Sequence, residues 1–173
     1  GARFYERLEI RDALAYLRVL ESPRHDLAFE RVLNKPKRGL GDATVRTLHE
    51  AARATGTSLV EAAQRLVTTD ELRPAARRAL SRLLADFARW RGLLDHLPHT
   101  EVAEVVLDES GYTAVWMNDK SADAPGRLEN LKELINAMAD FESLAGFLEH
   151  VALVMELNEA EGREMVSLMT LHA

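Results

Sequence analysis

The apolar residues of this chain recur mainly at the spacing of an α-helix. The first series consists of Ile10, Ala13, Leu14, Leu17 and Leu20. Residues three and four positions apart share one face of a helix, so this series predicts an amphipathic helix with one buried side. We expect the helix to stop near Ser22-Pro23, because a proline disfavours helical geometry in the residue before it.

Similar series predict an all-α fold of about nine helices. The further helices are expected at about residues 26–33, 42–54, 59–66, 74–97, 100–111, 112–117, 127–142 and 143–157. The segment 74–97 is the longest of them. At about 1.5 Å per residue it would form a rod of about 36 Å, long enough to be the spine of the domain.

The pattern changes after residue 157. Asn158–Arg163 is expected to be an acidic loop, and Met165–Leu171 has the composition of a strand. A single strand cannot stabilise itself, and no other segment shows clear strand-like alternation. We therefore expect residues 165–173 to belong to a sheet that lies outside this sequence.

Composition narrows the class of protein. The 173 residues suffice for one compact domain, and the apolar content of 47% argues against disorder. No apolar run approaches the ~20 residues of a membrane span, and no cleavable leader opens the chain, so no membrane partner is expected. The absence of cysteine excludes disulfides and thiolate metal sites and fits a reducing cytoplasm.

The stretch Asn34–Thr44 carries the main candidate chemistry. Its triplet Gly39-Leu40-Gly41 allows a sharp turn whose N–H groups point outward at the start of the next helix. Such a helix start binds anions. We interpret the stretch as a helix-hairpin-helix that holds a nucleic-acid phosphate backbone without reading bases, with Leu40 as its apolar anchor. The alternative is a tight turn with only a structural role.

Local charge favours the binding interpretation. Five cationic residues between positions 31 and 46 face one acid, Asp42, which gives a local charge of +4 in a chain whose net charge is -6. The cationic residues are Arg31, Lys35, Lys37, Arg38 and Arg46. A basic cluster in an acidic chain indicates a localised contact with a polyanion rather than a generally adhesive surface.

Other candidate sites are weaker. His96 and His99 lack an evident third metal ligand, so we expect no metal site. Glu9 and Asp12 are expected to be helical surface acids. The aromatic residues on the apolar faces are expected to belong to the core rather than to stack on bases; they are Phe87, Trp90, Trp116 and Phe141.

Four stretches, in order, resemble the UvrD/PcrA/Rep branch of superfamily 1 DNA helicases. Residues 3–18 look like the family's segment entering its 2B subdomain, and Arg38-Gly-Leu-Gly-Asp42, with the preceding residues 26–36, resembles its Gly-Ile-Gly hairpin with leucine in place of isoleucine. Arg127-Leu-Glu-Asn-Leu-Lys-Glu-Leu134 is similar to a helix of the same subdomain, and residues 166–173 look like the first half of helicase motif V.

The resemblance implies a division of the chain and a role for each part. Residues 1–7 would be a lead-in from the second RecA-like motor domain, 8–164 the helical 2B subdomain and 165–173 the start of the motif V strand. The subdomain would grip duplex DNA at a single-strand/double-strand junction and control a 3'-5' helicase of DNA repair or replication by rotating against the motor domains. The parent protein would be bacterial, cytoplasmic and nucleoid-associated, and repair or transcription proteins are further candidate partners.

The resemblance also assigns residues. Those expected to contact duplex backbone are Lys35, Lys37, Arg38, Gly39, Leu40, Gly41 and Thr44. Thr170 and His172 match motif V positions that touch single-stranded DNA. The chain has no phosphate-binding loop of the Gly-x-x-x-x-Gly-Lys-Ser/Thr type. We therefore expect no catalytic residues and no cofactor in this chain, and we expect ATP and Mg²⁺ to be bound by its parent helicase.

A second function remains open. The same helices could form a module that docks to repair or transcription proteins, or to a second copy of the chain through the terminal strand. A stand-alone enzyme is disfavoured, because no set of catalytic residues is evident.

Overall fold

The computed structural model describes residues 1–172, which form ten α-helices and no strand. The helices are α1 (Ala2–Glu6), α2 (Leu8–Glu21), α3 (Asp26–Val32), α4 (Asp42–Thr55), α5 (Leu59–Leu66), α6 (Pro74–Leu93), α7 (His99–Glu109), α8 (Tyr112–Asn118), α9 (Ala124–Met138) and α10 (Leu144–Leu171). The all-α prediction is confirmed. The additional helix is α1, which occupies the expected lead-in.

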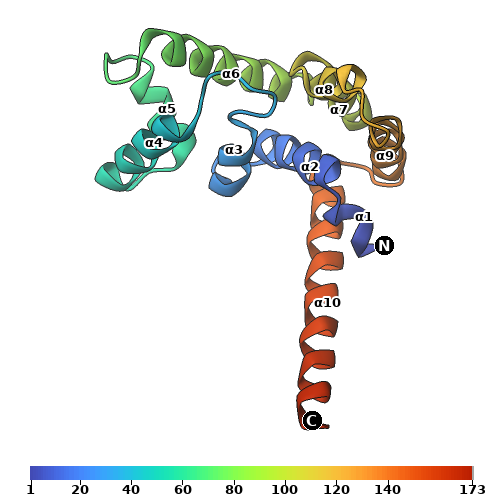
Figure 1. Cartoon of the computed structure of the whole chain (residues 1–173). Coiled ribbons are helices and arrows are strands. Elements are labelled where there is room, and N and C mark those ends of the chain that lie inside the picture. The colour runs from blue at the N-terminus through green and yellow to red at the C-terminus, as the bar shows by residue number, and fades with distance from the viewer. Residues whose placement is uncertain (173) are drawn as a thin grey trace.

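Helix α2 is the centre of the bundle. It packs against α1, α3, α6, α7, α9 and α10, and between Glu9 and Leu20 only Arg11 is exposed. A helix that is buried on nearly every side lies inside a core. The prediction that residues 74–97 form the spine is therefore wrong. Helix α6 buries one stripe and lies across one edge of the bundle (Figure 1).

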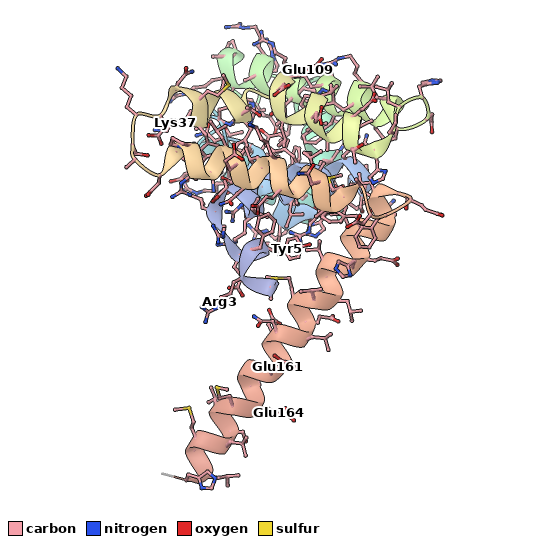
Figure 2. The ribbon with its side chains drawn as sticks, turned by 90° about the vertical axis from the view of Figure 1, so that its right-hand side faces the viewer. Arg3, Tyr5, Lys37, Glu109, Glu161 and Glu164 are labelled. Carbon is pink, nitrogen blue, oxygen red and sulfur yellow. The ribbon has the colours of Figure 1, made fainter. Side chains whose placement is uncertain are left out.

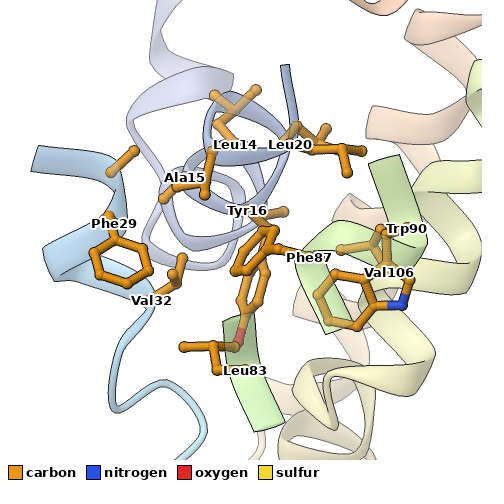
Figure 3. Packing of buried hydrophobic residues seen from close by; sticks show 14 of the residues in the cluster. Leu14, Ala15, Tyr16, Leu20, Phe29, Val32, Leu83, Phe87, Trp90 and Val106 are labelled. Atoms are coloured by element: carbon orange, nitrogen blue, oxygen red, sulfur yellow. The ribbon is translucent and has the colours of Figure 1, made fainter. Parts of the chain in front are cut away.

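Aromatic side chains fill the contact between α2 and α6. Tyr16 is fully buried and stacks on Phe87 at 5.9 Å between ring centroids, while Trp90 packs edge-on against Phe87 at 5.1 Å (Figure 3). Tyr112 of α8 lies 6.2 Å from Tyr16. These aromatic contacts join α2, α6 and α8 into one core. The prediction that Phe87 and Trp90 belong to the core is confirmed.

The predicted loop at 158–163 and the predicted strand at 165–173 are wrong over the described residues. Both segments continue α10, which runs unbroken to Leu171 and projects from the bundle (Figure 1); Ala173 lies outside the described residues. Glu, Leu and Met are strong helix formers. A helix pairs its own backbone groups, whereas a strand needs a neighbouring strand, and residues 1–172 offer none.

Candidate nucleic-acid interface

The segment 33–41 joins α3 to α4 and brings both glycines of the predicted turn to the surface. Gly39 is exposed and has φ of +78°, a left-handed conformation that favours glycine. Gly41 is also exposed, with φ of −85° and ψ of −160°. Leu40 between them is fully buried, at 0% exposure. Its burial confirms the prediction that it anchors the turn in the apolar core.

The first turn of α4 leaves backbone N–H groups open. Gly41 is the N-cap residue, and no side chain caps the helix. The first hydrogen bond of the helix runs from Val45 N to Gly41 O, at 3.1 Å. The amides of Asp42 and Ala43 precede that bond and belong to exposed residues. Uncapped amides at a helix start carry partial positive charge and attract anions.

The Asn34 side chain shapes the turn from inside. Its Oδ1 accepts hydrogen bonds from Arg38 N at 2.6 Å and from Leu40 N at 3.3 Å. These bonds pair the amides of Arg38 and Leu40, whereas the amides of Gly39 and Gly41 have no hydrogen-bond partner within residues 1–172. Sequence reasoning assigned no role to Asn34, although asparagine is common in turns because its side chain bonds nearby backbone.

The Arg38 guanidinium points into the protein rather than toward solvent. Its Nη1 donates to Val32 O at 2.6 Å, and its Nη2 donates to the Tyr16 hydroxyl at 2.5 Å and to Ser110 O at 3.3 Å. These bonds hold the segment 33–41 against α2 and the end of α7. Arg38 is therefore placed to support the turn, and its guanidinium is already occupied.

Tyr16 connects this surface segment to the core. Its hydroxyl donates to the Lys35 carbonyl and accepts from Arg38. Burial raises the pKa of the Tyr16 hydroxyl, and the neighbouring Arg38 charge opposes that shift. The phenol stays protonated at neutral pH and can act as donor and acceptor at once.

The turn between α7 and α8 supports the segment from the other side. Gly111 has φ of +85°, and a Cβ added there would lie 3.3 Å from Pro36 Cγ. The proline ring thus packs directly on the backbone of Gly111. Together with the bond from Arg38 to Ser110 O, this contact fixes the segment to a part of the chain far away in sequence.

Two carboxylates that were expected at the surface are buried. Glu9 is 2% exposed and Asp12 is 4% exposed, so the prediction of surface acids is wrong for both. Asp12 Oδ1 accepts from Arg31 Nε at 2.8 Å and from Lys35 Nζ at 3.4 Å, and Oδ2 accepts from the Tyr112 hydroxyl at 2.7 Å. The ammonium of Lys35 is therefore turned partly toward α2.

The Glu9 carboxylate ties α2 to α9. Its Oε1 accepts from Arg127 Nη1 at 3.2 Å, and its Oε2 accepts from Asn130 Nδ2 at 2.9 Å. Arg127 and Asn130 are three residues apart and lie on one face of α9. Their partner could not be identified from the sequence, because it is more than 100 positions away in the chain.

Lys37 is the cation of the segment that remains available at the surface. It is exposed, and among the described residues it forms neither an ion pair nor a side-chain hydrogen bond. Thr44, in contrast, is 8% exposed and packs into the protein. Of the residues predicted to contact duplex backbone, the structure thus exposes Gly39, Gly41 and Lys37 and buries Leu40 and Thr44.

Thr170 and His172 lie apart from this segment. They are at the end of α10, beyond Glu161 and Glu164, where the helix projects away from the body of the bundle that holds Lys37 (Figure 2). Thr170 is exposed, and its hydroxyl donates to Val166 O at 2.9 Å within the same helix.

The described residues offer few other candidate sites. Within them no group of three His, Asp or Glu side chains could hold a metal ion. His99 Nε2 lies 2.9 Å from Met138 O, a contact that joins α7 to α9. None of the helices in residues 1–172 is both long and apolar enough to cross a membrane.

Comparison with known proteins gives one consistent family. Residues 1–173 match the UvrD-like helicase C-terminal domain. The chain is 35% identical to a DNA helicase II of Rickettsia typhi, 33% to the ATP-dependent DNA helicase PcrA of Bacillus subtilis and 33% to DNA helicase II of Escherichia coli. All of the chain is covered in each comparison, and it spans about a quarter of these relatives' length (27%, 25% and 25%). The chain therefore belongs to the UvrD-like helicase C-terminal domain family.

Proposed function

We propose that residues 8–164 are the 2B subdomain of a UvrD/PcrA-type DNA helicase and that the segment 33–41 grips duplex DNA by its sugar–phosphate backbone. The family match supports the parentage, since the matched relatives are DNA helicases by name. The observation that carries the proposal is the exposed Gly39–Gly41 turn beside an uncapped helix start.

The turn suits a phosphate because it offers donors without obstruction. A Cβ added at Gly39 or at Gly41 would meet no protein atom within 4 Å, so the outer side of the turn is open. A phosphate can approach the backbone closely there and accept hydrogen bonds from the amides at the start of α4. Backbone amides carry no information about base sequence, so the contact would be independent of sequence.

We assign different roles to the cationic residues of the segment. Lys37 would contact phosphate directly, because it is exposed and unpaired among the described residues. Arg38 and Lys35 would act as positioning residues, since Arg38 is bonded to Tyr16 and to backbone carbonyls and Lys35 lies 3.4 Å from Asp12. Leu40 and Thr44 would hold the turn in place by packing.

In the parent protein the subdomain would act on a motor that lies outside this chain. ATP and Mg²⁺ would bind that motor, and rotation of the 2B subdomain against it would engage or release the duplex ahead of a junction. Thr170 and His172 would contact single-stranded DNA within the motor. Residues 165–173 would be the start of the motor's motif V.

A protein-interaction role is the second candidate, and one observation favours it. Seven large apolar side chains of α10 are exposed on its outer part: Leu153, Leu157, Met165, Val166, Leu168, Met169 and Leu171. Exposed apolar surface of this kind is typical of an interface. Its partner would be the motor, a repair or transcription protein, or a second copy of the chain.

The proposal is tested in the full-length helicase with bulky replacements of both Gly39 and Gly41. Duplex engagement should fall while ATPase activity stimulated by single-stranded DNA stays largely intact, because the turn would touch only duplex. Equal loss of both activities would contradict the assignment. A salt titration of duplex binding by the chain separates the second candidate, since contacts with phosphate weaken steeply with salt and an apolar protein interface does not.

A further inference from the structure

A small pocket lies between the segment 33–41 and α6. It has a volume of about 310 Å³, and its lining includes Lys37 and Arg38 from the segment and Arg82 from α6. The connection from α3 to α4 runs up to α6 before it reaches α4 (Figure 1). Arg82 of α6 and the exposed Lys37 thus line the same pocket.

The acids of the pocket are already paired. Asp86 and Glu109 also line it, but Arg89 binds both, with Nη2 3.1 Å from Asp86 Oδ1 and Nη1 2.5 Å from Glu109 Oε1. The indole Nε1 of Trp90 donates to the same Glu109 oxygen at 2.8 Å. These bonds keep the pKa of the Glu109 carboxyl below its usual range, and Arg89 holds both acidic side chains.

Two cations of the pocket are left without partners. Lys37 and Arg82 are exposed, and within residues 1–172 neither forms an ion pair. Arg38 is bonded to neutral oxygens, which leaves its charge uncompensated. The four cationic side chains in and around the pocket outnumber the two carboxylates, so the site is locally positive in a chain of net charge -6.

We propose that this pocket binds a second backbone phosphate of the same duplex, held by Arg82 of α6 together with Lys37. The inference rests on the proposed function of the segment 33–41 and extends it. An arginine fork and a flexible ammonium from opposite walls suit the several oxygens of one phosphate group. The duplex would then lie along α6 as well as across the turn, and two contacts would fix its direction where one would leave it free to pivot.

The test measures binding of a blunt DNA duplex by the chain at one fixed salt concentration, using the variants R82Q, K37Q and R78Q. Arg78 is the matched control, because it is an exposed arginine one turn earlier on α6 that does not line the pocket. R82Q and K37Q should each weaken binding about two- to fivefold, in keeping with solvent-exposed ion pairs, and R78Q should have less effect than R82Q.

A double-mutant cycle decides whether Lys37 and Arg82 share a phosphate. The loss in K37Q/R82Q should be smaller than the product of the two single losses, whereas the losses in K37Q/R78Q should multiply. The proposed phosphate site would be wrong if R82Q and R78Q weakened duplex binding equally. It would also be wrong if the loss of affinity in K37Q/R82Q equalled the product of the two single losses. If K37Q weakens duplex binding and R82Q does not, only this inference fails. If neither variant weakens duplex binding and replacement of Gly41 also has no effect on it, the proposed function fails as well.

Discussion

The Arg38 guanidinium and the Tyr16 hydroxyl lie 2.5 Å apart, which joins a surface turn to the centre of the core. Tyr16 is fully buried on α2 and also donates to the Lys35 carbonyl. The position of the Gly39–Gly41 turn is therefore set by a side chain inside the protein. Removal of that one hydroxyl should disturb the turn without touching any residue proposed to contact DNA.

We expect Tyr16→Phe to destabilise the protein by about 1–3 kcal/mol, because it leaves the Lys35 carbonyl and one Arg38 N–H without their partner while the ring still fills the core. Duplex affinity should fall as well, since the turn loses support. Urea unfolding and fluorescence anisotropy measure the two effects. Tyr5→Phe is the control, because the Tyr5 hydroxyl has no hydrogen-bond partner within residues 1–172. Equal stability of the two variants would contradict the role of Tyr16.

The two lysines of the segment should differ in their effect on DNA binding. Lys37→Gln should weaken duplex binding about two- to fivefold and lessen its salt dependence, because an exposed cation that neutralises phosphate is lost. Lys35→Gln should leave the salt dependence almost unchanged, since the Lys35 ammonium lies beside Asp12. A titration of each variant from low to moderate salt measures this difference. A larger effect of Lys35 than of Lys37 would reverse our assignment of their roles.

Stability should fall at alkaline pH through Tyr112. Burial, and then its hydrogen bond to Asp12, raise the pKa of the Tyr112 hydroxyl above the ordinary value of 10.0. The folded state therefore keeps this proton where the unfolded state loses it. The contribution of Tyr112 to the free energy of unfolding is complete below pH 10. Above pH 10 it falls by up to about 1.4 kcal/mol per pH unit.

Tyr112→Phe isolates this contribution. The variant should be less stable than the unmutated protein at pH 7, because Asp12 loses a hydrogen bond. The difference in the free energy of unfolding should narrow as the pH rises above 10. There the unmutated protein loses stability because its folded state must keep the Tyr112 phenol protonated, whereas the phenylalanine variant has no such proton. Urea unfolding of both proteins at several pH values measures the gap. A constant difference across this range would show that Tyr112 does not titrate as we expect.

The elements that could be predicted are those whose signal is local. The apolar series of α2 and α6 and the glycines around Leu40 predicted helices, a buried anchor and an exposed turn, because each depends on residues a few positions apart. The family resemblance rested on short motifs in order, and the match of residues 1–173 to the UvrD-like helicase C-terminal domain confirms the family. The assignment to the 2B subdomain stays a prediction.

The features that were missed depend on partners distant in sequence. Asp12 and Glu9 looked like surface acids because Tyr112, Arg127 and Asn130, which bind them, are about 100 or more positions away. The inward course of the Arg38 side chain could not be foreseen either, because its partners Tyr16 and Ser110 are 22 and 72 positions away. The end of α10 was misjudged because strand-like composition does not produce a strand without a neighbouring one.

The most direct test of the central claim is duplex binding by Gly41→Ala. Its φ of −85° suits alanine, and the new methyl group meets no protein atom within 4 Å. Stability should therefore be unchanged or rise by about 0.4–1 kcal/mol.

Gly162→Ala on the projecting part of α10 is the matched control, since it makes the same replacement at an exposed glycine outside the turn. If a phosphate binds the turn closely, Gly41→Ala should weaken duplex binding about tenfold through lost charge-assisted hydrogen bonds, with Gly162→Ala unaffected. Undiminished duplex binding by a fully stable Gly41→Ala protein would contradict the account.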